Sequence, residues 1–349
     1  MKMVLNTLPA RTWNRLGINE SIVNIDEIFK SYTPTTEWTE KTAKWKAVAS
    51  EDFGWSKVKT GVGSDITTLT EGAELSSVTT DKDVVMDKPI VLKYIYKDGE
   101  NAISRLKIHA KENSTLSIVL LFQNETENDK GISVLQTHIV TEENAKVNIS
   151  IVQMLAPGFK CFNDIGGVCE EFSGVELNKL ELGSGDVYAG AYIDLKGEES
   201  FFETNIGYHV RSNEHLDMNY VAMHHGKNTQ SLMEVNGILE EASHKAFRGT
   251  IDFQHGCRGA KGKETETVLL LGDELINQTT PLILCREEDV EGIHGATIGR
   301  LDEKVLFYLS SRGISEKEAQ QIIAQSRIDA ICEKIPDEET RSIVQTFEM

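Results

Sequence analysis

The segment FFETNIGYHVRSNEHLDMNYVAMHHGKNTQSLMEVNGILE, residues 201–240, decides the fold class. It contains three runs, at 201–210, 215–225 and 230–240, in which apolar and polar residues alternate. Alternation with a period of two, together with frequent Val, Ile, Thr, Tyr and Phe, is typical of β-strands. The short polar turns SNE and HGKNT separate the runs. The segment therefore predicts consecutive strands without intervening helices.

Similar runs fill much of the chain on both sides of this segment. They lie at 89–96, 105–110, 115–123, 146–155, 174–182, 186–195, 245–255, 266–273 and 281–287. Closely spaced strands of this kind fit a β-sandwich, a barrel or a solenoid. About a dozen strands are more than one ordinary sandwich contains, so we favour a mainly β solenoid. We place its core at residues 89–299, between a tryptophan-rich unit and a helical unit that can cap its ends.

Residues 1–60 are expected to form a separate N-terminal helical unit. The run INESIVNIDEIFKSY has apolar residues at roughly helical spacing, namely Ile22, Ile25, Ile28 and Phe29. All four tryptophans lie in this unit: Trp13, Trp38, Trp45 and Trp55. We assign them to the core of the unit in preference to a partner-binding surface. The polar, glycine-bearing residues 61–88 predict an irregular linker.

Residues 300–349 are expected to be a helical tail. Asp302 can cap a first helix, and Gly313 followed by Ile314 fits the end of that helix with its apolar contact. We expect the inward-facing residues of this helix to be Val305, Leu306 and Leu309.

The sequence SEKE, residues 315–318, is typical of a capping box that opens a second helix. Pro336 ends this helix, and Asp337 can cap a short third helix. The apolar stripe of the second helix consists of Ala319, Ile322, Ile323, Ile328, Ile331 and Ile335. Such a tail is either a lid on the β-domain or a docking surface for another protein.

Composition excludes several classes of partner. The chain of 349 residues carries 55 acidic and 36 basic residues and a formal net charge of -19. This charge repels phosphate backbones and anionic lipids, so we expect neither nucleic acid nor a membrane as a partner. The sequence opens without a signal-peptide pattern, which favours a cytoplasmic protein. The five cysteines contain no CxxC pair, and we interpret them mostly as reduced thiols.

The run GCRGAKGKE, from Gly256 to Glu264, fails as a phosphate loop. Five residues separate Gly256 from Gly262 where four are needed, and Glu264 follows Lys263 where Ser or Thr is needed. We therefore expect no nucleotide on this chain and interpret the run as a flexible basic turn between two strands.

Histidine and cysteine side chains are candidate metal ligands. His224 and His225 are adjacent on a strand and point to opposite faces, so this pair alone is a poor metal site. His255 and Cys257 would share a face if their strand continued, which would make half of a metal site, although a chance pair beside a turn is the simpler interpretation.

The last histidine of the chain, His294, leaves two interpretations open. Cys285 and His294 flank the turn REEDVEG, where the fold could bring them together with Glu291 nearby. Spacing alone favours a structural histidine held by backbone hydrogen bonds near the end of the β-domain. A neutral imidazole is nevertheless a good ligand for iron or zinc.

The stretch EGIHGATIGRLDEKVLFYLSSRGISEKEA, residues 291–319, resembles the C-terminal signature of the SufB/SufD family of iron–sulfur cluster assembly scaffolds. Its recognisable parts are HGATIG, LDEKVLFYLSSRGIS and the following Glu318 and Ala319. Upstream, FRGTIDF, ETVLLLGD and TTPLIL are similar to strands of the family in the same order. The run LPARTWNRLGIN is similar to the N-terminal entry of its shorter bacterial members.

This resemblance implies a right-handed parallel β-helix flanked by N-terminal and C-terminal helical segments. It also implies two partners: a SufB-type scaffold chain that pairs through the ends of the β-helices, and SufC, an ABC-type ATPase that docks on the C-terminal helices. The residues implied for docking are Leu306, Phe307, Tyr308, Arg312, Gly313 and Ile314. His294 matches the histidine that the family places at the interface between scaffold chains, where a transient iron–sulfur cluster is shared.

One departure from the family pattern points to a SufD-like, non-catalytic subunit, and a second argues against direct cluster ligation by this chain. Glu266 stands where SufB-type chains have an interface cysteine, and Gly292 stands where many SufD-type chains have one. Cys257 and Cys285 are weaker candidate ligands because neither occupies a matched position. The alternatives are a self-pairing homodimeric scaffold that builds the cluster itself, an intracellular β-helical carbohydrate-active enzyme, and a purely structural solenoid.

Overall fold

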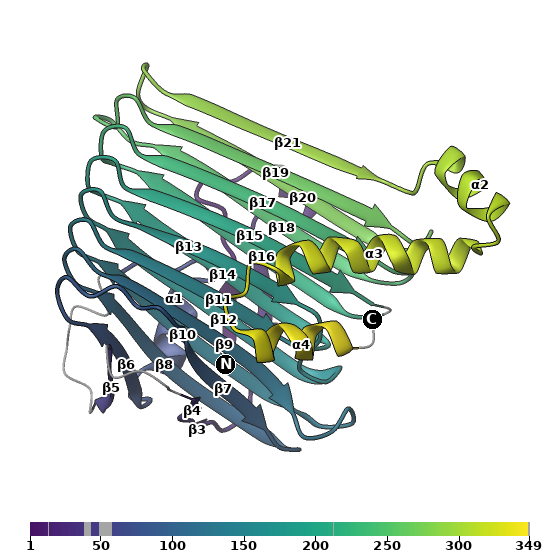
Figure 1. Cartoon of the computed structure of the whole chain (residues 1–349), viewed down its shortest axis with the longest axis horizontal. Coiled ribbons are helices and arrows are strands. Elements are labelled where there is room, and N and C mark those ends of the chain that lie inside the picture. Colours follow the sequence, from purple (N-terminus) through teal and green to yellow (C-terminus); the bar gives the residue numbers. More distant parts are fainter. Residues whose placement is uncertain (13, 38–42, 49–57, 212, 348–349) are drawn as a thin grey trace.

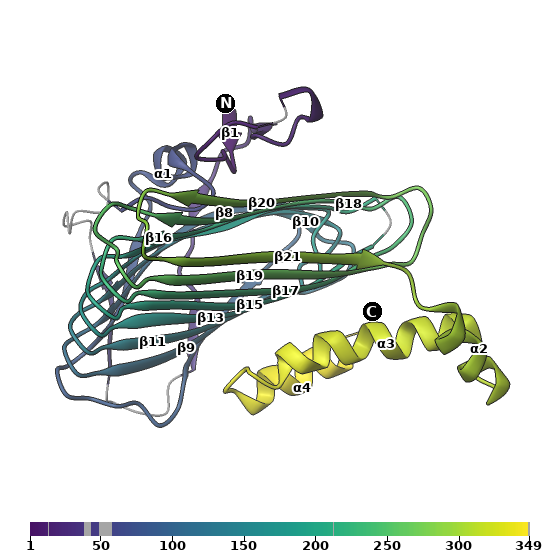
Figure 2. The same cartoon turned by 90° about the horizontal axis from the view of Figure 1, so that it is seen from above.

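A computed structural model describes residues 1–12, 14–37, 43–48, 58–211 and 213–347, and for residues 37 and 43–48 it describes the backbone alone. The main body is a parallel β-helix with two long sheets, whose strands run across the view in Figure 1 and which Figure 2 shows from above. This architecture confirms the predicted mainly β solenoid.

Each coil of the β-helix gives one strand to each sheet. Sheet 1 consists, in spatial order, of β20 (Ile276–Cys285), β18 (His244–Phe253), β16 (His215–His224), β14 (Asp186–Leu195), β12 (Gly158–Cys169), β10 (Lys130–Thr141), β8 (Glu100–Ala110), β6 (Leu75–Thr80) and β5 (Ala43–Val48), with β3 (Lys30–Ser31) beside β8. Sheet 2 consists of β21 (Glu291–Gly299), β19 (Lys261–Leu270), β17 (Gln230–Leu239), β15 (Phe201–Val210), β13 (Gly174–Glu181), β11 (Lys146–Gln153), β9 (Thr115–Asn124), β7 (Ile90–Tyr96) and β4 (Thr35–Glu37).

The two ends of the β-helix differ. Successive coils are parallel and in register, so that His215 of β16 lies between Asp186 of β14 and His244 of β18. At the N-terminal end, β4 and β5 are the last strands of the two sheets and pair antiparallel with β7 and β6, so the parallel stacking of coils stops there. At the C-terminal end, β20 pairs with β18 and β21 pairs with β19. The C-terminal end therefore presents the outer edges of two strands.

The interior between the sheets combines apolar columns with paired charges. Aligned inward side chains of successive coils stack on each other, as the rings of Tyr94 and Phe122 do at a centroid distance of 4.6 Å. The buried Lys179 and Glu181 form an ion pair, with 2.9 Å between Nζ and Oε1. A charged group at such depth is tolerated because it is paired.

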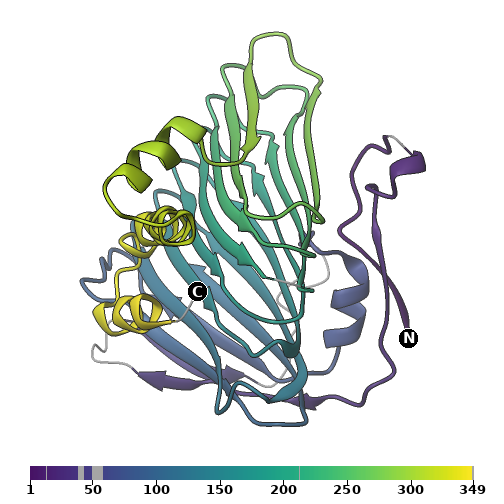
Figure 3. The same cartoon turned by 90° about the vertical axis from the view of Figure 1, so that its right-hand side faces the viewer.

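Three helices follow β21: α2 (Glu303–Ser311), α3 (Glu316–Cys332) and α4 (Glu338–Thr346). Figure 3 shows α3 and α4 on the outer side of sheet 2, where Ile328 and Ile331 are buried in one apolar cluster with Leu180 and Leu182. α2 lies beyond the edge of the sheets (Figure 1). Among the described residues, no helix has both the length and the apolar character that crossing a membrane requires.

The predicted caps of these helices are confirmed. Asp302 accepts a hydrogen bond from Lys304 N, and Asp337 accepts one from Thr340 N. Ser315 and Glu318 form the reciprocal capping box. After α2, Gly313 has φ 86°, and Ile314 N donates to Leu309 O at 3.1 Å. Short-range sequence signals therefore placed the three helix starts and the end of α2 correctly, whereas α3 ends at Cys332, before the predicted stop at Pro336.

The predicted apolar faces of the tail are wrong in two places. Val305 is 43% exposed and every residue of α2 is exposed or half-buried, so this helix turns no apolar face toward the described part of the β-helix. Ile322 is 55% exposed, because the helical period places it on the side of α3 away from the buried Ala324 and Ile328.

The prediction of a helical N-terminal unit is wrong for the described part of residues 1–60. This part forms β1 (Lys2–Leu5), a single 3-10 turn η1 (Asn14–Leu16), β2 (Ser21–Asn24) and β3 to β5. Val23 and Ile25 are buried while Ile22 and Ile28 are exposed, which is the period of a strand and not of a helix. Trp13, Trp38 and Trp55 lie outside the described residues, and Trp45 is described only through the backbone of β5.

Residues 61–88 are not an irregular linker, because they contain α1 (Ser64–Thr70) and β6. Ile66 of α1 is buried with Met3 and Leu5 of β1 in an apolar cluster over the outer face of sheet 1. Small polar residues made this segment read as a linker, but these tertiary contacts override local propensity.

Two strands in the middle of the β-helix, β10 and β12, lie outside the runs identified in the sequence. The centre of β10 is polar because α1 covers it: Gln136 Nε2 donates to Thr67 Oγ1 at 2.8 Å. β12 contains Gly166, where a Cβ atom would lie 2.4 Å from Lys59 O of the crossing N-terminal segment. Polar and glycine residues weaken a strand pattern, yet here they accommodate the segments that cross sheet 1.

Candidate functional site

The candidate site is the open C-terminal end of the β-helix. Within the described structure, β20 and β21 each have one paired neighbour and one free edge. The residues of β21 from Glu291 to Ile298 are exposed, including Ile293 at 47% and Ile298 at 44%. Unpaired edges with apolar side chains are templates for pairing with another chain.

The strand register orients His294 toward the interior side of this end. His294 of β21 lies beside Glu264 of β19 in the parallel pairing. Register partners in parallel strands project their side chains to the same face, and Glu264 is only 1% exposed. His294 therefore belongs to the interior-facing side of the last coil, and it is exposed because the described chain adds no further coil over it.

Glu264 is a buried carboxylate beside this histidine. Its Oε2 atom has no hydrogen-bond partner among the described residues. Burial, and next the charge of Glu266, raise the pKa of Glu264 to about 8, against the opposing effect of Lys245. Gly249, on the opposite sheet, makes room for the carboxylate, since a Cβ atom there would lie 2.4 Å from Glu264 Oε1.

Glu266 lies two residues further along β19, and both oxygens of its carboxylate accept hydrogen bonds. Its Oε1 atom accepts hydrogen bonds from Tyr208 Oη at 3.0 Å and from Lys245 Nζ at 2.6 Å. Thr279 Oγ1 donates to Oε2 at 2.6 Å. Burial lowers the pKa of Lys245, and the charge of Glu266 opposes that effect. Glu266, where the family resemblance implies a thiol in SufB-type chains, is thus part of an internal ion pair here.

The structure separates the weaker candidate ligands. β18 ends at Phe253, and beyond it His255 is exposed whereas Cys257 is buried, so the two do not share a face. Burial raises the pKa of Cys257 to about 11. Cys285 is the exposed last residue of β20 in sheet 1, whereas His294 lies in sheet 2. In the described ranges, no group of three or more His, Cys, Asp and Glu side chains is placed to hold a metal ion.

The adjacent histidines His224 and His225 point to opposite sides, as predicted. His224 is buried with its ring nitrogens 2.8 Å from Thr229 Oγ1 and 2.9 Å from Ser231 Oγ, and burial lowers its pKa to about 3. His225 pairs with Asp194 at the surface, with 2.6 Å between Nδ1 and Oδ1. Both have structural partners.

The residues predicted for docking lie on α2 and the turn that follows it. Phe307 is 77% exposed and Tyr308 is 55% exposed. The guanidinium of Arg312 lies 5.0 Å from the centre of the Tyr308 ring, which is a cation–π contact. Leu306 and Ile314 are half-buried. This arrangement presents two neighbouring aromatic rings and a cation to solvent.

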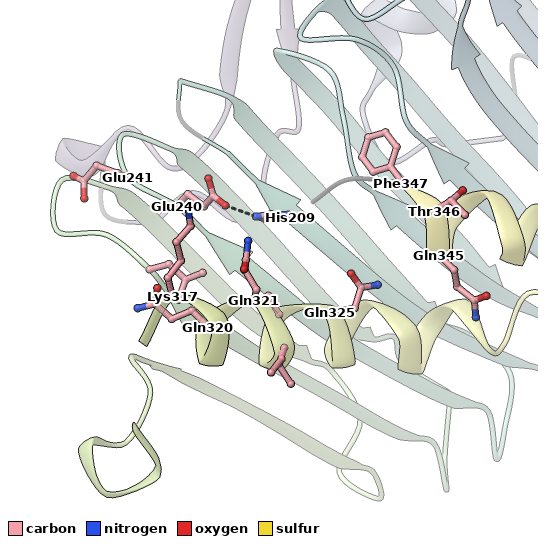
Figure 4. Close-up of a pocket in the computed structure, with 13 residues that line it drawn as sticks. His209, Glu240, Glu241, Lys317, Gln320, Gln321, Gln325, Gln345, Thr346 and Phe347 are labelled. Carbon is pink, nitrogen blue, oxygen red and sulfur yellow. Dashed lines mark hydrogen bonds and ion pairs between the residues drawn. The ribbon is translucent and has the colours of Figure 1, made fainter. Parts of the chain in front are cut away.

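A second feature, which the sequence did not indicate, is a cavity of about 620 Å³ between α3 and the ends of β15 and β17 (Figure 4). His209 Nε2 lies 2.9 Å from Glu240 Oε1 at its wall, and the hydrogen bond from His209 lowers the pKa of Glu240. The described lining contains none of the predicted site residues. In the sequence His209 and Glu240 look like two unrelated polar residues, because only the pairing of neighbouring coils brings them into contact.

Glu264 also escaped the sequence analysis as a site residue. In the run KGKETETVLL, Glu264 and Glu266 alternate with other charged or small polar residues. Glutamates in such a run ordinarily face solvent. The structure places both glutamates inside. The signal that could have revealed them is the alignment of this run with the family-like HGATIG run. In the parallel pairing of the two strands, Glu264 lies beside His294.

Comparison with known proteins agrees with the geometry. The family model described as SUF system FeS cluster assembly, SufBD core domain, matches residues 94–327. Iron-sulfur cluster assembly protein SufD of Bacillus subtilis is 23% identical over 259 residues, which are 74% of this chain and 59% of that protein. SufB of the same organism is 27% identical over 171 residues, or 49% of this chain and 37% of that protein.

SufD of Escherichia coli is 34% identical over 101 residues, which are 29% of this chain and 24% of that protein. The aligned part of this chain thus spans less than two thirds of each of these relatives. The family model, in contrast, covers well over half of this chain, including the strands that carry Glu264 and His294. The chain belongs to the SufBD core family of the SUF system for iron–sulfur cluster assembly.

Proposed function

We propose that this chain is a SufD-like scaffold subunit that acts in the cytoplasm without catalytic activity of its own. It pairs with a SufB-type chain and binds the SufC ATPase. The observation that carries the proposal is the open end of the β-helix, with two free strand edges and the inward-facing His294. Membership in an assembly family favours this role over carbohydrate chemistry.

The free edges of β20 and β21 are the proposed scaffold interface. Each edge offers backbone N–H and C=O groups that a second chain can pair with, so both sheets can continue into the partner. Ile293 and Ile298 supply apolar area to this contact. Because His294 lies on the interior-facing side, a partner docked there would enclose it together with its own donors. The iron–sulfur cluster is the cargo at this seam.

The exposed aromatic surface of α2 is the proposed SufC contact. Residues 300–302 alone separate β21 from α2. Arg300 is anchored to Asp273 by an ion pair and to Gly272 O by a hydrogen bond of 3.2 Å. A force on α2 would therefore reach β21, an edge strand with one neighbour, through a very short connection. ATP-driven dimerisation of SufC could in this way open the scaffold interface around His294.

The test is anaerobic co-purification of this chain with a SufB-type chain and SufC from the same organism. Iron and acid-labile sulfide are measured for the wild type, His294→Ala and the control His225→Ala, whose side chain is at the surface of an internal coil. We expect all three complexes to form and only His294→Ala to lose most of its cluster. Normal cluster content in His294→Ala would make the histidine structural, and no complex with either partner would overturn the proposal.

The same edges support one alternative partner, a second copy of this chain. Both sheets end in free edges within one chain, so two copies could pair through β20 and β21. Sedimentation of the isolated chain and of the mixture with a SufB-type chain separates the two cases. A homodimer that persists in the mixture and carries the cluster would replace the heterodimer in this proposal.

A further inference from the structure

We infer that Glu264 and His294 form a two-donor half-site for ferrous iron at the open end of the β-helix. This inference deepens the proposed function, on which it rests, by naming a second ligand from this chain. The family resemblance indicates only the histidine. Only the geometry of the structure indicates Glu264 as a second ligand.

The first argument is placement. Glu264 and His294 are register partners on β19 and β21, and their side chains leave the same face of sheet 2. Neighbouring strands are about 4.8 Å apart, so two such side chains can reach one metal ion between their tips. Imidazole nitrogen with carboxylate oxygen is a donor set that suits ferrous iron.

The second argument is the state of the carboxylate. Glu264 is 1% exposed, and its Oε2 atom is without a hydrogen-bond partner among the described residues. A buried carboxyl group with one oxygen left without a partner is costly, and a cation or another ligand can complete it. Its neighbour Glu266 shows the contrast, because Tyr208, Lys245 and Thr279 satisfy both of its oxygens.

The third argument is the space provided for the carboxylate. At Gly249 of β18, a Cβ atom would lie 2.4 Å from Oε1 and 2.5 Å from Oε2 of Glu264. A side chain at this position would thus push the carboxylate out of its place. The glycine on the facing sheet holds open the room in which the carboxylate lies beside the last coil.

The test titrates the isolated full-length chain with Co(II), a spectroscopic substitute for ferrous iron, under anaerobic conditions. The proteins are the wild type, His294→Ala, Glu264→Gln and the control Glu291→Gln. Glu291 lies on the same edge strand but is exposed and pairs with Lys261 at 3.5 Å. The readouts are the affinity and the visible absorption bands of the bound ion, and competition by Fe(II) checks that the same site takes iron.

We expect one Co(II) per chain for the wild type and for Glu291→Gln. Glu264→Gln and His294→Ala should each weaken binding at least tenfold and change the absorption bands. Gly249→Ala should weaken binding as well, with Glu264 itself unchanged, and it serves as the second variant if Glu264→Gln fails to fold. Wild-type-like binding by a folded Glu264→Gln or Gly249→Ala, or no binding by the wild type, would overturn the inference.

Co-purification with the SufB-type chain and SufC keeps the two proposals apart. Glu264→Gln should leave the yield of the complex unchanged while lowering its iron content severalfold. If no complex forms with the wild type but Co(II) binding depends on both residues, the proposed partners are wrong and the half-site stands. If the complex forms and Glu264→Gln retains full iron and full Co(II) affinity, the half-site is wrong and the proposed function stands.

Discussion

Asp217 and Arg248 form an ion pair on the outer face of sheet 1 that the N-terminal segment covers completely. Each side chain is 2% exposed. Asn6 Nδ2 donates to Asp217 Oδ1 at 2.6 Å, and Arg248 Nε donates to Ile18 O at 2.6 Å. The pair lies on neighbouring coils, β16 and β18, so it ties the N-terminal segment to the C-terminal half of the solenoid.

We expect Arg248→Ala to destabilise the protein by about 3–5 kcal/mol, because it leaves the Asp217 carboxylate buried without its partner. The double variant Asp217→Asn with Arg248→Met should recover much of this loss, since no unpaired charge remains. Urea unfolding gives the free energies, and limited proteolysis between residues 8 and 20 reports whether the segment has detached. Equal stability of the wild type and Arg248→Ala would contradict the assigned role of the pair.

Residues 61–88, which the sequence predicts to be a linker, contact Asp164, and this aspartate makes the free energy of unfolding depend on pH. Val62 N donates to Asp164 Oδ1 at 2.7 Å and Gln136 Nε2 donates to Oδ2 at 2.9 Å. Burial, the largest effect, nevertheless raises the pKa of Asp164 to about 6 from 3.8. An acid with a raised pKa in the folded state weakens folding when it is ionised, and lowering the pH from 6 toward 3.8 removes that penalty.

We therefore compare Asp164→Asn with the wild type across pH. The pH-dependent part of their difference in unfolding free energy should amount to roughly 2.4 kcal/mol between pH 7.5 and pH 4, with the wild type gaining relative stability as the pH falls. Chemical unfolding at several pH values measures it, and taking the difference cancels the other titrating groups. A difference that is independent of pH would show that Asp164 titrates normally in the folded protein.

The packing of α3 predicts opposite results for two isoleucines on the same helix. Ile328 is fully buried against sheet 2, so Ile328→Ala should cost about 2–5 kcal/mol of stability. Ile322 is 55% exposed, so Ile322→Ala should change stability by no more than about 0.5 kcal/mol. Thermal or urea unfolding of both variants is the measurement, and a similar loss in both would mean that α3 packs through a different face.

These examples show which parts of the molecule the sequence predicts. The alternating runs predicted the solenoid because a period of two is a property of each strand by itself. Asp302, Ser315 and Asp337 predicted the helix starts because a cap acts within one turn of the chain. The direction of Ile322, in contrast, depends on where sheet 2 lies relative to α3, and that relationship is tertiary.

The residues of the candidate site also divide into those that the sequence indicates and those that only the structure places. His294 was found because the HGATIG run resembles a known family, while its inward orientation needed the register of β19 and β21. Glu264 was missed because alternating glutamates usually face solvent, and only the closed coil shows that they face inward. Cys257 and Cys285 were placed by proximity in sequence, which a β-helix does not preserve, since neighbours in space are one coil apart.

The exposed aromatic pair of α2 predicts how SufC binding can be separated from folding. Removing the whole tail would also uncover the apolar cluster that α3 and α4 form with sheet 2, so truncation cannot distinguish lost docking from lost stability.

Phe307 and Tyr308 are 77% and 55% exposed, and the double variant Phe307→Ala with Tyr308→Ala should leave the unfolding free energy within about 0.5 kcal/mol of the wild type. Truncating an aromatic hot-spot residue at an interface costs about 2 kcal/mol or more, so SufC affinity should fall about thirtyfold if one of the two rings is a hot spot and about a thousandfold if both are. Binding to immobilised chain measures the affinity, with Phe172→Ala, exposed by 47% at a remote corner of the β-helix, as the matched aromatic control. Unchanged SufC affinity in the double variant would place the ATPase contact elsewhere, while loss of binding in both variants would mean that exposed aromatic area anywhere on this chain attracts SufC.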